Sequence, residues 1–321
     1  MIKKARVMAG LDIDWSEHRK KYGELNPDTT FYVIRRGDEH AGINSQFNTN
    51  LGHVRYAVNN GWIPVIDMQN YPNAYLEETK AGRNAWDFYF KQPFSDKYSL
   101  NEIYQSKNVI LSSGEPLSVC PGDNMEFFTR PELIDMWHRY FVKYIGFSTA
   151  LMDEIEKKYN QYFKEKEGGR ILGVSLRGTD YFNKPYEHPV QPTIEQAIEV
   201  THKVIEEQKW KWIYLAAEDV HIIDAYEQEF GECLFYVREV QAYGDLKPGE
   251  NITSHSFDRE NDRYLRGMEY MMQKALLTKC NCLIGGRTSG NVAVMVWKPK
   301  YDYTYFWNLG RYGIDDVIDR V

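Results

Sequence analysis

The chain has 321 residues, of which 43% are hydrophobic and 26% are charged, and its formal net charge is −7. This balance is typical of a globular protein that is long enough for two domains, so it argues against a disordered chain. A nucleic-acid-binding protein usually carries a basic excess, and the acidic balance therefore argues against nucleic acid as a partner.

The N-terminal segment does not have the pattern of an export signal. Residues 1–4 (MIKK) resemble the basic start of a signal peptide, but Asp12 and Asp14 interrupt the apolar region that should follow. No stretch of about 18 apolar residues is present, so we expect no membrane span. We expect a cytoplasmic protein whose cysteines are buried, reduced thiols. These cysteines are Cys120, Cys233, Cys280 and Cys282.

The first half of the chain alternates strands and helices. The expected strands are 31–36, 62–68 and 109–112, and the expected helices are 45–60 and a long stretch from Pro131. This βαβ order predicts a parallel sheet. The long helical stretch becomes strongly charged over residues 154–166, and Gly168 and Gly169 then interrupt it. We therefore expect one domain of residues 1–167 and a second of residues 168–321.

The second half repeats the alternation more clearly. Thr193 and Gln196 have the spacing of a capping box at the start of a helix. The expected strands are 171–177, 212–217, 234–237, 282–286 and 303–308, and the expected helices are 193–208, 220–230, 262–278 and one from Ser289. Residues 241–260 form a long polar loop, which in a compact domain is usually functional or disordered. The whole pattern predicts two α/β halves with a cleft between them.

Two segments that follow predicted strands have the chemistry of an anion site. Open α/β sheets bind ligands beyond the carboxyl ends of their strands. Arg177 follows the strand 171–177 directly, and a guanidinium binds two phosphate oxygens at once; a surface salt bridge with Asp180 is the alternative. Residues 285–291 (GGRTSGN) begin a helix, whose free N–H groups attract phosphate. They lack the lysine of an ATPase phosphate loop and the G-x-G-x-x-G of a dinucleotide site, and simple helix capping is the alternative.

Carboxylates near these segments are candidates for ligand contacts and acid–base chemistry. Asp219 follows the strand 212–217, where it would hold a ribose or base, although a helix N-cap is the commoner role. Glu187 and His188 lie in a proline-containing loop and are candidates for a general base. Asp12 and Asp14 have the D-x-D spacing of some metal sites, but they precede the first complete nucleotide-binding βαβ unit, so we expect no metal there.

Four segments of the second half, in this order, resemble the fucosyltransferase superfamily of nodulation, core α1,6- and protein O-fucosyltransferases. They are 174–180 (VSLRGTD, like H-x-R-R-T-D), 215–219 (LAAED, like L-A-T-D-D), 262–267 (DRYLRG, like R-Y…L-R-G) and 283–291 (at the place of an F-S-S turn). Residues 42–45 (GINS) and 61–68 (GWIPVIDM) resemble a bacterial polysaccharide-locus branch. The chain departs from the usual pattern at Ser175 and Gly178, and it lacks the G-x-G-N loop.

The resemblance implies a GT-B fold, with two Rossmann-like lobes, parallel sheets, the donor on the C-terminal lobe and the acceptor in the cleft. It also implies that Arg177 binds the donor diphosphate and stabilises the charge that leaves with it. Asp219 and Glu269 would contact the nucleoside. The residues expected around the nucleotide sugar are Gly42, Asn44, Asp219, Glu269, Gly286, Thr288, Ser289 and Gly290.

These expectations combine into an inverting glycosyltransferase that needs no metal or cofactor. It would move a sugar, with fucose favoured, from a GDP-sugar to a glycan or lipid-linked oligosaccharide in bacterial surface polysaccharide synthesis. Contact with a membrane would come only through the acceptor. Asp180 or Glu187 would take the proton of the acceptor hydroxyl. The alternatives are an inactive glycan- or nucleotide-binding protein on the same fold and, less favoured, a Rossmann-fold oxidoreductase.

Overall fold

The computed structural model describes residues 14–117, 119–122, 125–244, 246 and 252–314. The chain forms two compact units. Met1–Leu151 and Asp258–Gly267 make up the first, and Met152–Phe257 and Met268–Val321 make up the second. Helix α5 (Thr149–Tyr162) and helix α8 (Asp262–Leu276) each have residues in both units.

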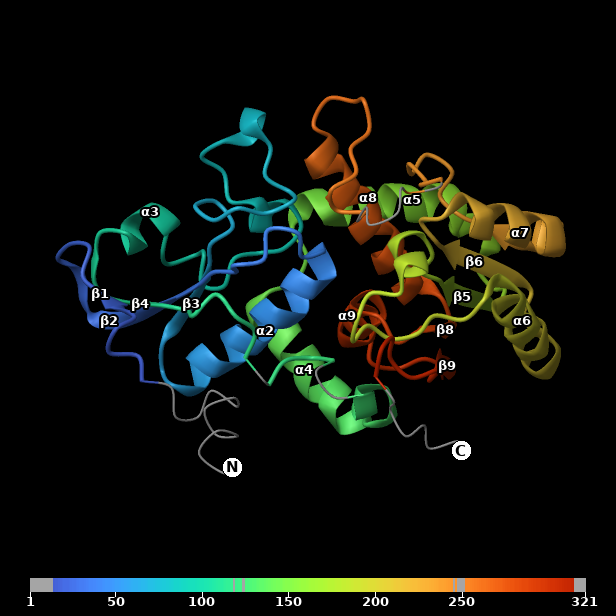
Figure 1. Cartoon of the computed structure of the whole chain (residues 1–321), viewed down its shortest axis with the longest axis horizontal. Helices are drawn as coiled ribbons and strands as arrows, with labels where there is room; N and C mark the ends of the chain where they lie inside the picture. Colours follow the sequence, from blue (N-terminus) through green and yellow to red (C-terminus); the bar gives the residue numbers. More distant parts are fainter. Residues whose placement is uncertain (1–13, 118, 123–124, 245, 247–251, 315–321) are drawn as a thin grey trace. The chain divides into compact units, whose positions relative to one another are not determined.

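The first unit contains a mostly parallel sheet of four strands in the order β1-β4-β2-β3 (Figure 1). Strands β2, β3 and β4 are parallel, and only β1 is antiparallel to its neighbour. The strands are β1 (Arg19–Lys20), β2 (Leu25–Ile34), β3 (Ile63–Ile66) and β4 (Ser106–Leu111). Strand β2 begins well before the predicted Phe31, because Leu25 pairs with Ser106 across an irregular stretch that has no hydrophobic alternation.

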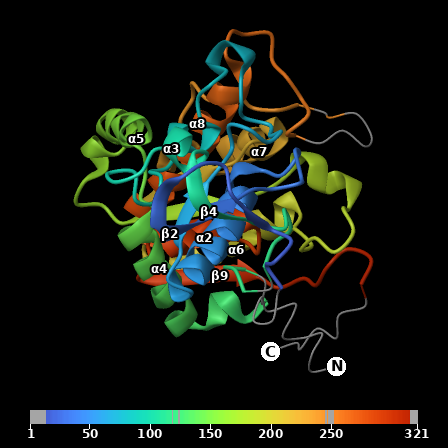
Figure 2. The same cartoon turned by 90° about the vertical axis from the view of Figure 1, so that its left-hand side faces the viewer.

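Helices cover the two faces of this sheet. Helix α2 (Ile43–Asn59) packs against β2 and β3 (Figure 2). The phenol of Tyr32 lies 2.9 Å from Nδ1 of His53 on that helix. Phe31 and Val33, which alternate with Tyr32 along the strand, pack in a separate apolar cluster with Ile103 of α3 (Leu100–Ile103). The other helices are the 3₁₀ turns Glu78–Lys80, Ala85–Phe88 and Met125–Thr129 and the α-helix α4 (Pro131–Tyr144).

The second unit contains a fully parallel sheet of five strands in the order β7-β6-β5-β8-β9. The strands are β5 (Ile171–Ser175), β6 (Trp212–Ala216), β7 (Leu234–Phe235), β8 (Cys282–Gly286) and β9 (Tyr303–Trp307). From β5 the chain moves to β6 and β7 on one side and then returns to β8 on the other. The gap between β5 and β8 is therefore the topological switch point of the sheet.

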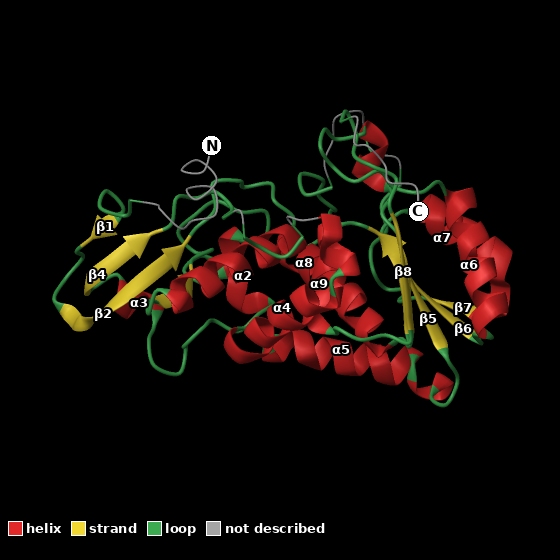
Figure 3. Ribbon diagram, turned by 90° about the horizontal axis from the view of Figure 1, so that it is seen from below, coloured by secondary structure: helices red, strands yellow, loops and turns green. Residues whose placement is uncertain are grey.

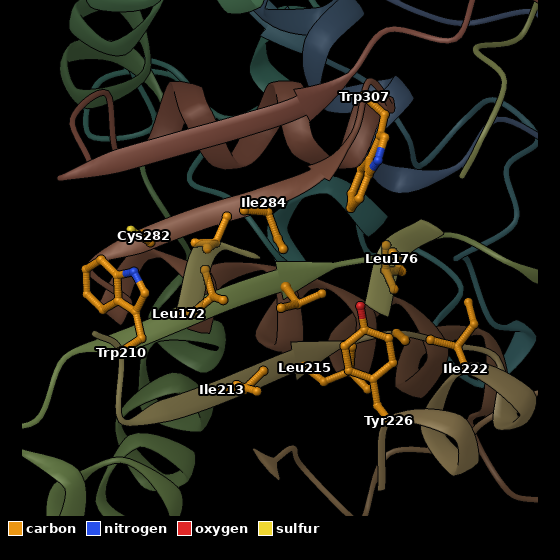
Figure 4. Close-up of a cluster of buried hydrophobic side chains, with 14 residues drawn as sticks. Leu172, Leu176, Trp210, Ile213, Leu215, Ile222, Tyr226, Cys282, Ile284 and Trp307 are labelled. Carbon is orange, nitrogen blue, oxygen red and sulfur yellow. The ribbon is translucent and has the colours of Figure 1, made fainter. Parts of the chain in front are cut away.

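This sheet lies between two layers of helices (Figure 3). Helices α6 (Ile194–Gln208) and α7 (Val220–Phe230) cover one face, where side chains such as Leu172, Ile213 and Tyr226 form a dense apolar cluster (Figure 4). Helix α9 (Ser289–Trp297) and the second-unit part of α8 cover the other face. The phenol of Tyr214 on that face donates to the backbone carbonyl of Gln273 at 3.1 Å, which fixes α8 to β6.

Most predicted elements of the second half are confirmed, including the capping box at Thr193 and Gln196 that begins α6. Cys120, Cys280 and Cys282 are buried as expected, but Cys233 is exposed because it lies in a surface 3₁₀ turn, Gly231–Cys233. Among the described residues, no helix combines the length and the apolar composition that a membrane span requires. The predicted α/β class with two parallel sheets is confirmed.

Candidate functional site

The candidate site lies in the second unit at the switch point, where the carboxyl ends of β5 and β8 are neighbours. Arg177 follows β5, and residues 287–288 connect β8 to α9. Ser175 pairs with Gly285 at this end of the two strands. Two segments that lie more than 100 positions apart in the chain are therefore brought to one edge, which is where open α/β sheets bind their ligands.

The first turn of α9 forms one wall of the site. Thr288 is its N-cap, and the Thr288 hydroxyl accepts a hydrogen bond from the backbone N–H of Asn291 at 3.3 Å. The remaining N–H groups of a helix's first turn have no partner within the helix, so they and the helix dipole attract anions. Gly290 is buried, whereas Ser289 is exposed. The predicted phosphate-binding turn is thus a capped helix N-terminus at the switch point.

Gly286 lies against the side-chain amide of Gln191. A Cβ atom built on Gly286 would lie 2.1 Å from Oε1 of Gln191. Gln191 belongs to the loop that also carries Glu187 and His188, and its Nε2 donates to the Pro189 carbonyl at 2.9 Å. This loop therefore lies against the carboxyl end of β8, beside the first turn of α9.

Arg177 occupies the other wall and is 17% exposed. Its Nη1 donates to both carboxylate oxygens of Glu218, at 3.0 and 3.1 Å, and its Nη2 donates to Asp180 at 2.9 Å. Burial lowers the pKa of Arg177, but the attraction of Glu218 and Asp180 is larger in sum and leaves that pKa well above its ordinary value. Within the described part of the chain, Nε of Arg177 is buried without a hydrogen-bond partner. The guanidinium is thus always charged and has one N–H available.

Asp219 ties the Arg177 loop to helix α7. One carboxylate oxygen accepts the backbone N–H of Thr179 at 2.7 Å, and the other accepts the backbone N–H of His221 at 2.9 Å as the N-cap of α7. The side chain is 1% exposed, and its second oxygen also lies 3.0 Å from Nδ1 of His221. Asp219 is therefore at the predicted strand end, with both oxygens bound to protein groups.

The two candidate general bases differ in their surroundings. Asp180 is half-buried beside Arg177 and accepts the Thr179 hydroxyl at 3.2 Å. Glu187 is exposed, and its backbone has a left-handed φ of 64° and donates to the Tyr312 carbonyl at 2.9 Å. An exposed loop carboxylate is free to meet an acceptor, whereas Asp180 is already held by Arg177.

His188 and Tyr181 also belong to this edge. The Nδ1 atom of His188 lies 3.3 Å from the Tyr181 phenol, whose ring faces the Arg177 guanidinium at 5.4 Å. Burial lowers the pKa of His188 and raises that of Tyr181 to about 12. At neutral pH the imidazole is therefore mostly neutral and the phenol protonated, so both can exchange hydrogen bonds with an uncharged sugar hydroxyl.

A cavity of about 220 Å³ adjoins the same edge at the ends of β6 and β7. Its walls are mostly apolar, and the polar groups Asp224, Arg238 and Gln273 interrupt them. Gln273 lies on α8, and the predicted nucleoside contact Glu269 lies one turn earlier on the same helix face. Apolar walls with a few polar groups are typical of small-ligand pockets.

Sequence reasoning missed one charged group at this edge, Lys274 of α8. Its ammonium is buried and donates to the Ser175 hydroxyl at 2.8 Å. The signal was a single lysine among the buried residues Met271, Ala275 and Leu276 of the same helix. A cation on an apolar helix face requires a specific partner, and that pattern was available in the sequence.

The remaining predicted residues, Gly42 and Asn44, lie in the first unit. Gly42 is the N-cap of α2, and Asn44 in its first turn is 2% exposed. Among the described residues neither amide atom of Asn44 has a hydrogen-bond partner. A buried amide without a partner is costly, so this helix start has the polar groups of a ligand site.

The D-x-D pair falls partly outside the described residues, because Asp12 and Ile13 precede them. Asp14 is exposed, and its carboxylate accepts the backbone N–H of Ser16 at 2.9 Å. In the described part of the chain, no group of three or more His, Cys, Asp or Glu side chains is arranged to hold a metal ion.

Comparison with solved structures identifies the fold. A structure of the NodZ α-1,6-fucosyltransferase soaked with GDP-fucose is similar with a TM-score of 0.53 and 14% identity, over 89% of this chain and 98% of that one. The apo form of POFUT1 has a TM-score of 0.48 and 10% identity, over 89% and 99%. No protein-family model and no curated protein matches the chain. The chain therefore shares the two-lobed GT-B fold of the NodZ α-1,6-fucosyltransferase.

Proposed function

We propose that this protein is a glycosyltransferase that uses a GDP-sugar, with fucose as the favoured sugar. The observation that carries the proposal is that the neighbouring strands β5 and β8 bring Arg177 and the capped N-terminus of α9 to the same edge of the sheet, at its topological switch point. A guanidinium and a helix N-terminus are two groups that bind phosphate without a metal. The fold shared with a fucosyltransferase that was soaked with GDP-fucose supports the choice of donor.

The chemistry follows from the charge that develops in the reaction. Breaking the bond between the sugar C1 and the phosphate leaves negative charge on the departing diphosphate. Arg177, through its available Nε–H, and the first turn of α9 with Thr288, Ser289 and Gly290 would stabilise that charge. Gly286 would let the diphosphate approach the backbone at the end of β8. Attack from the opposite face of the sugar would invert the configuration at C1.

Proton removal from the acceptor is assigned to a carboxylate on the same edge. Glu187 is exposed on the loop beside α9, and Asp180 is half-buried next to Arg177. Either would accept the proton of an acceptor hydroxyl as the new bond forms. The acceptor class we propose is a glycan or lipid-linked oligosaccharide of a bacterial surface polysaccharide, which would bring a cytoplasmic enzyme to the membrane surface only through the acceptor.

The nucleoside is assigned to the region of the cavity at the ends of β6 and β7. The cavity is large enough for a fused ring system, and its wall includes Gln273, one turn from Glu269. Asp219 would have an indirect role: it fixes the backbone of Thr179 through a hydrogen bond, and the ribose would lie beside that backbone. Gly42 and Asn44, at the start of α2 in the first unit, are further candidates for contacts to the sugar nucleotide.

The test is nucleotide binding followed by turnover. At a ligand concentration about 100 times the dissociation constant, binding adds about 2.7 kcal/mol of stability, which is a measurable melting shift. We expect GDP to raise the melting temperature more than UDP, dTDP or ADP, and we expect slow hydrolysis of GDP-fucose without an acceptor. GDP binding without any hydrolysis or transfer would instead indicate an inactive binding protein. A larger shift with UDP or dTDP would overturn the choice of nucleotide.

A further inference from the structure

The candidate site contains a buried ammonium connected to it by a chain of hydrogen bonds. Lys274 is 3% exposed, and its Nζ donates to the Ser175 hydroxyl at 2.8 Å. That hydroxyl donates to Oδ1 of Asn291 at 2.5 Å, and Nδ2 of Asn291 donates to the Gly286 carbonyl at 2.7 Å. The chain joins α8 to β5, to the first turn of α9 and to the end of β8. Lys274 is thus linked to both segments that form the switch point.

The fold alone does not explain a cation at this position. Among the described residues no carboxylate forms an ion pair with Lys274, and its other neighbour is the ring of Tyr270, 5.6 Å from Nζ. Burying an ammonium with a hydroxyl as its hydrogen-bond partner costs free energy, and an apolar side chain would fill the same space at lower cost. A group that destabilises the folded protein in this way is a candidate for a functional role.

The charge balance of the site indicates which role this is. Arg177 is bound by Glu218 and Asp180 together, so this group of three side chains has one more negative than positive charge. Alone it would repel a diphosphate, because like charges at short range in a partly desolvated site are costly. The ammonium of Lys274 interacts electrostatically with Glu218 and Arg177, so its charge contributes to the electrostatic potential around this group. Its single positive charge offsets the excess negative charge of this group of three side chains.

We propose that Lys274 is a positioning cation of the donor site, which offsets the carboxylates around Arg177 and holds Ser175 and Asn291 so that the first turn of α9 faces the diphosphate. This inference rests on the proposed function and adds to it a residue and a charge state. Lys274 acts through Ser175 and Asn291, and Gly290 of the same turn lies against its side chain: a Cβ on that glycine would be 3.5 Å from Cε.

The role of Lys274 predicts a specific dependence on pH. Burial lowers the pKa of Lys274 to about 8, with a smaller raising effect from Glu218 and a lowering effect from Arg177. The charged groups that face it are Glu218 after β6 and Arg177 after β5, and Tyr270 faces it from its own helix. A diphosphate binds more tightly when the Lys274 ammonium is charged. The affinity of the protein for GDP should therefore fall as pH rises through about 8 and the ammonium loses its proton. The unliganded protein should instead gain stability between about pH 8 and 10.5, where only the unfolded lysine is still protonated.

The experiment compares Lys274→Met with Lys279→Met, an exposed lysine just after the same helix, by calorimetric titration with GDP and with guanosine. For Lys274→Met we expect GDP to bind about tenfold more weakly or worse at pH 7, guanosine to bind as in the wild type, and the fall in GDP affinity between pH 7 and 9 to disappear. Lys279→Met should match the wild type throughout. Equal weakening of GDP and guanosine, or an unchanged GDP affinity, would overturn the role of Lys274.

A second variant keeps the test decisive if Lys274→Met does not fold. Ser175→Ala removes the hydroxyl that Lys274 and Asn291 share, and we expect it to weaken GDP binding while leaving guanosine binding intact. Unchanged GDP binding in Ser175→Ala would contradict the hydrogen-bonded chain. If the wild-type protein itself binds no nucleoside diphosphate, the proposed function fails, which is a different result from normal GDP binding by Lys274→Met.

Discussion

Gly178 lies so close to Asp219 that a Cβ atom built on the glycine would be 2.3 Å from the carboxylate oxygen Oδ2. The same oxygen accepts the backbone N–H of Thr179, which has a left-handed φ of 54°. The carboxylate thus occupies the space that a side chain at position 178 would need. This packing explains why glycine stands where the fucosyltransferase-like motif has a second arginine.

Gly178→Ala should therefore destabilise the protein and distort the Arg177 loop. The methyl group must displace a buried carboxylate that caps α7, and overpacking of this kind costs about 1–3 kcal/mol. Urea denaturation measures the loss in free energy of unfolding. Gly244→Ala, whose Cβ would meet nothing within 4 Å, is the matched control and should unfold like the wild type. Equal stability of the two variants would contradict the close packing at Gly178.

Arg177→Lys should nearly abolish sugar transfer while the protein remains folded. A lysine keeps the charge, but its three N–H groups share one nitrogen on a shorter side chain. They cannot replace the separate Nη1, Nη2 and Nε positions that arginine offers to Glu218, Asp180 and the phosphate. Loss of one such contact to the transition state costs about 100-fold in turnover. Arg170→Lys, at the amino end of the same strand and paired with Asp302, is the control. If Arg177→Lys turns over within a few-fold of the wild type, Arg177 does not stabilise the charge on the leaving diphosphate.

The elements of the second unit could be predicted because their signals are local. The Thr193 capping box and the apolar strand ends depend on a few neighbouring residues, and parallel topology then brings Arg177 and Thr288 to one edge. The place of Lys274 could not be derived in this way, because its partner Ser175 is 99 positions away and only packing selects it. The early start of β2 at Leu25 also depends on a partner strand.

Transfer should continue at full rate in excess chelator. In the proposed mechanism Arg177, Lys274 and the N-terminus of α9 supply the positive charge that a divalent metal supplies in other transferases. The measurement is turnover of the donor with EDTA against an untreated sample. If activity is lost with EDTA and returns with manganese, the charge comes from a metal instead, and Asp12 and Asp14 become the first candidates for its ligands.

Replacing Asn44 by leucine should raise stability and reduce donor turnover together. Both amide atoms of Asn44 are buried without partners among the described residues, so an isosteric apolar side chain removes a desolvation penalty. If the amide binds the sugar nucleotide, the gain in melting temperature comes with a loss of activity, as is common at functional sites. Asn50→Leu, equally buried on the same helix, should be stabilised without that loss. Full turnover by Asn44→Leu would exclude Asn44 from the site.

The last prediction concerns how the base is recognised. Glu269 on α8 is half-buried, one turn before the cavity residue Gln273. A carboxylate accepts both the N1–H and the 2-amino group of guanine, whereas hypoxanthine has only the N1–H and uracil has a single, differently placed N–H. A carboxylate that the bound nucleotide covers but leaves without one of these donors costs about 1–3 kcal/mol, so the wild type should bind GDP about 5- to 150-fold more tightly than inosine diphosphate.

Glu269→Ala should remove most of that preference, because GDP loses two hydrogen bonds to the carboxylate and inosine diphosphate loses only one. Glu199→Ala, an exposed glutamate on α6, is the control and should keep the wild-type ratio of the two affinities. Calorimetric titration of both nucleotides into the three proteins gives the ratio directly. Because the ratio compares two ligands on the same protein, a general loss of stability in Glu269→Ala cancels from it. An unchanged ratio in Glu269→Ala would show that another group reads the 2-amino position, and Asp224 in the cavity wall would then be the next carboxylate to replace.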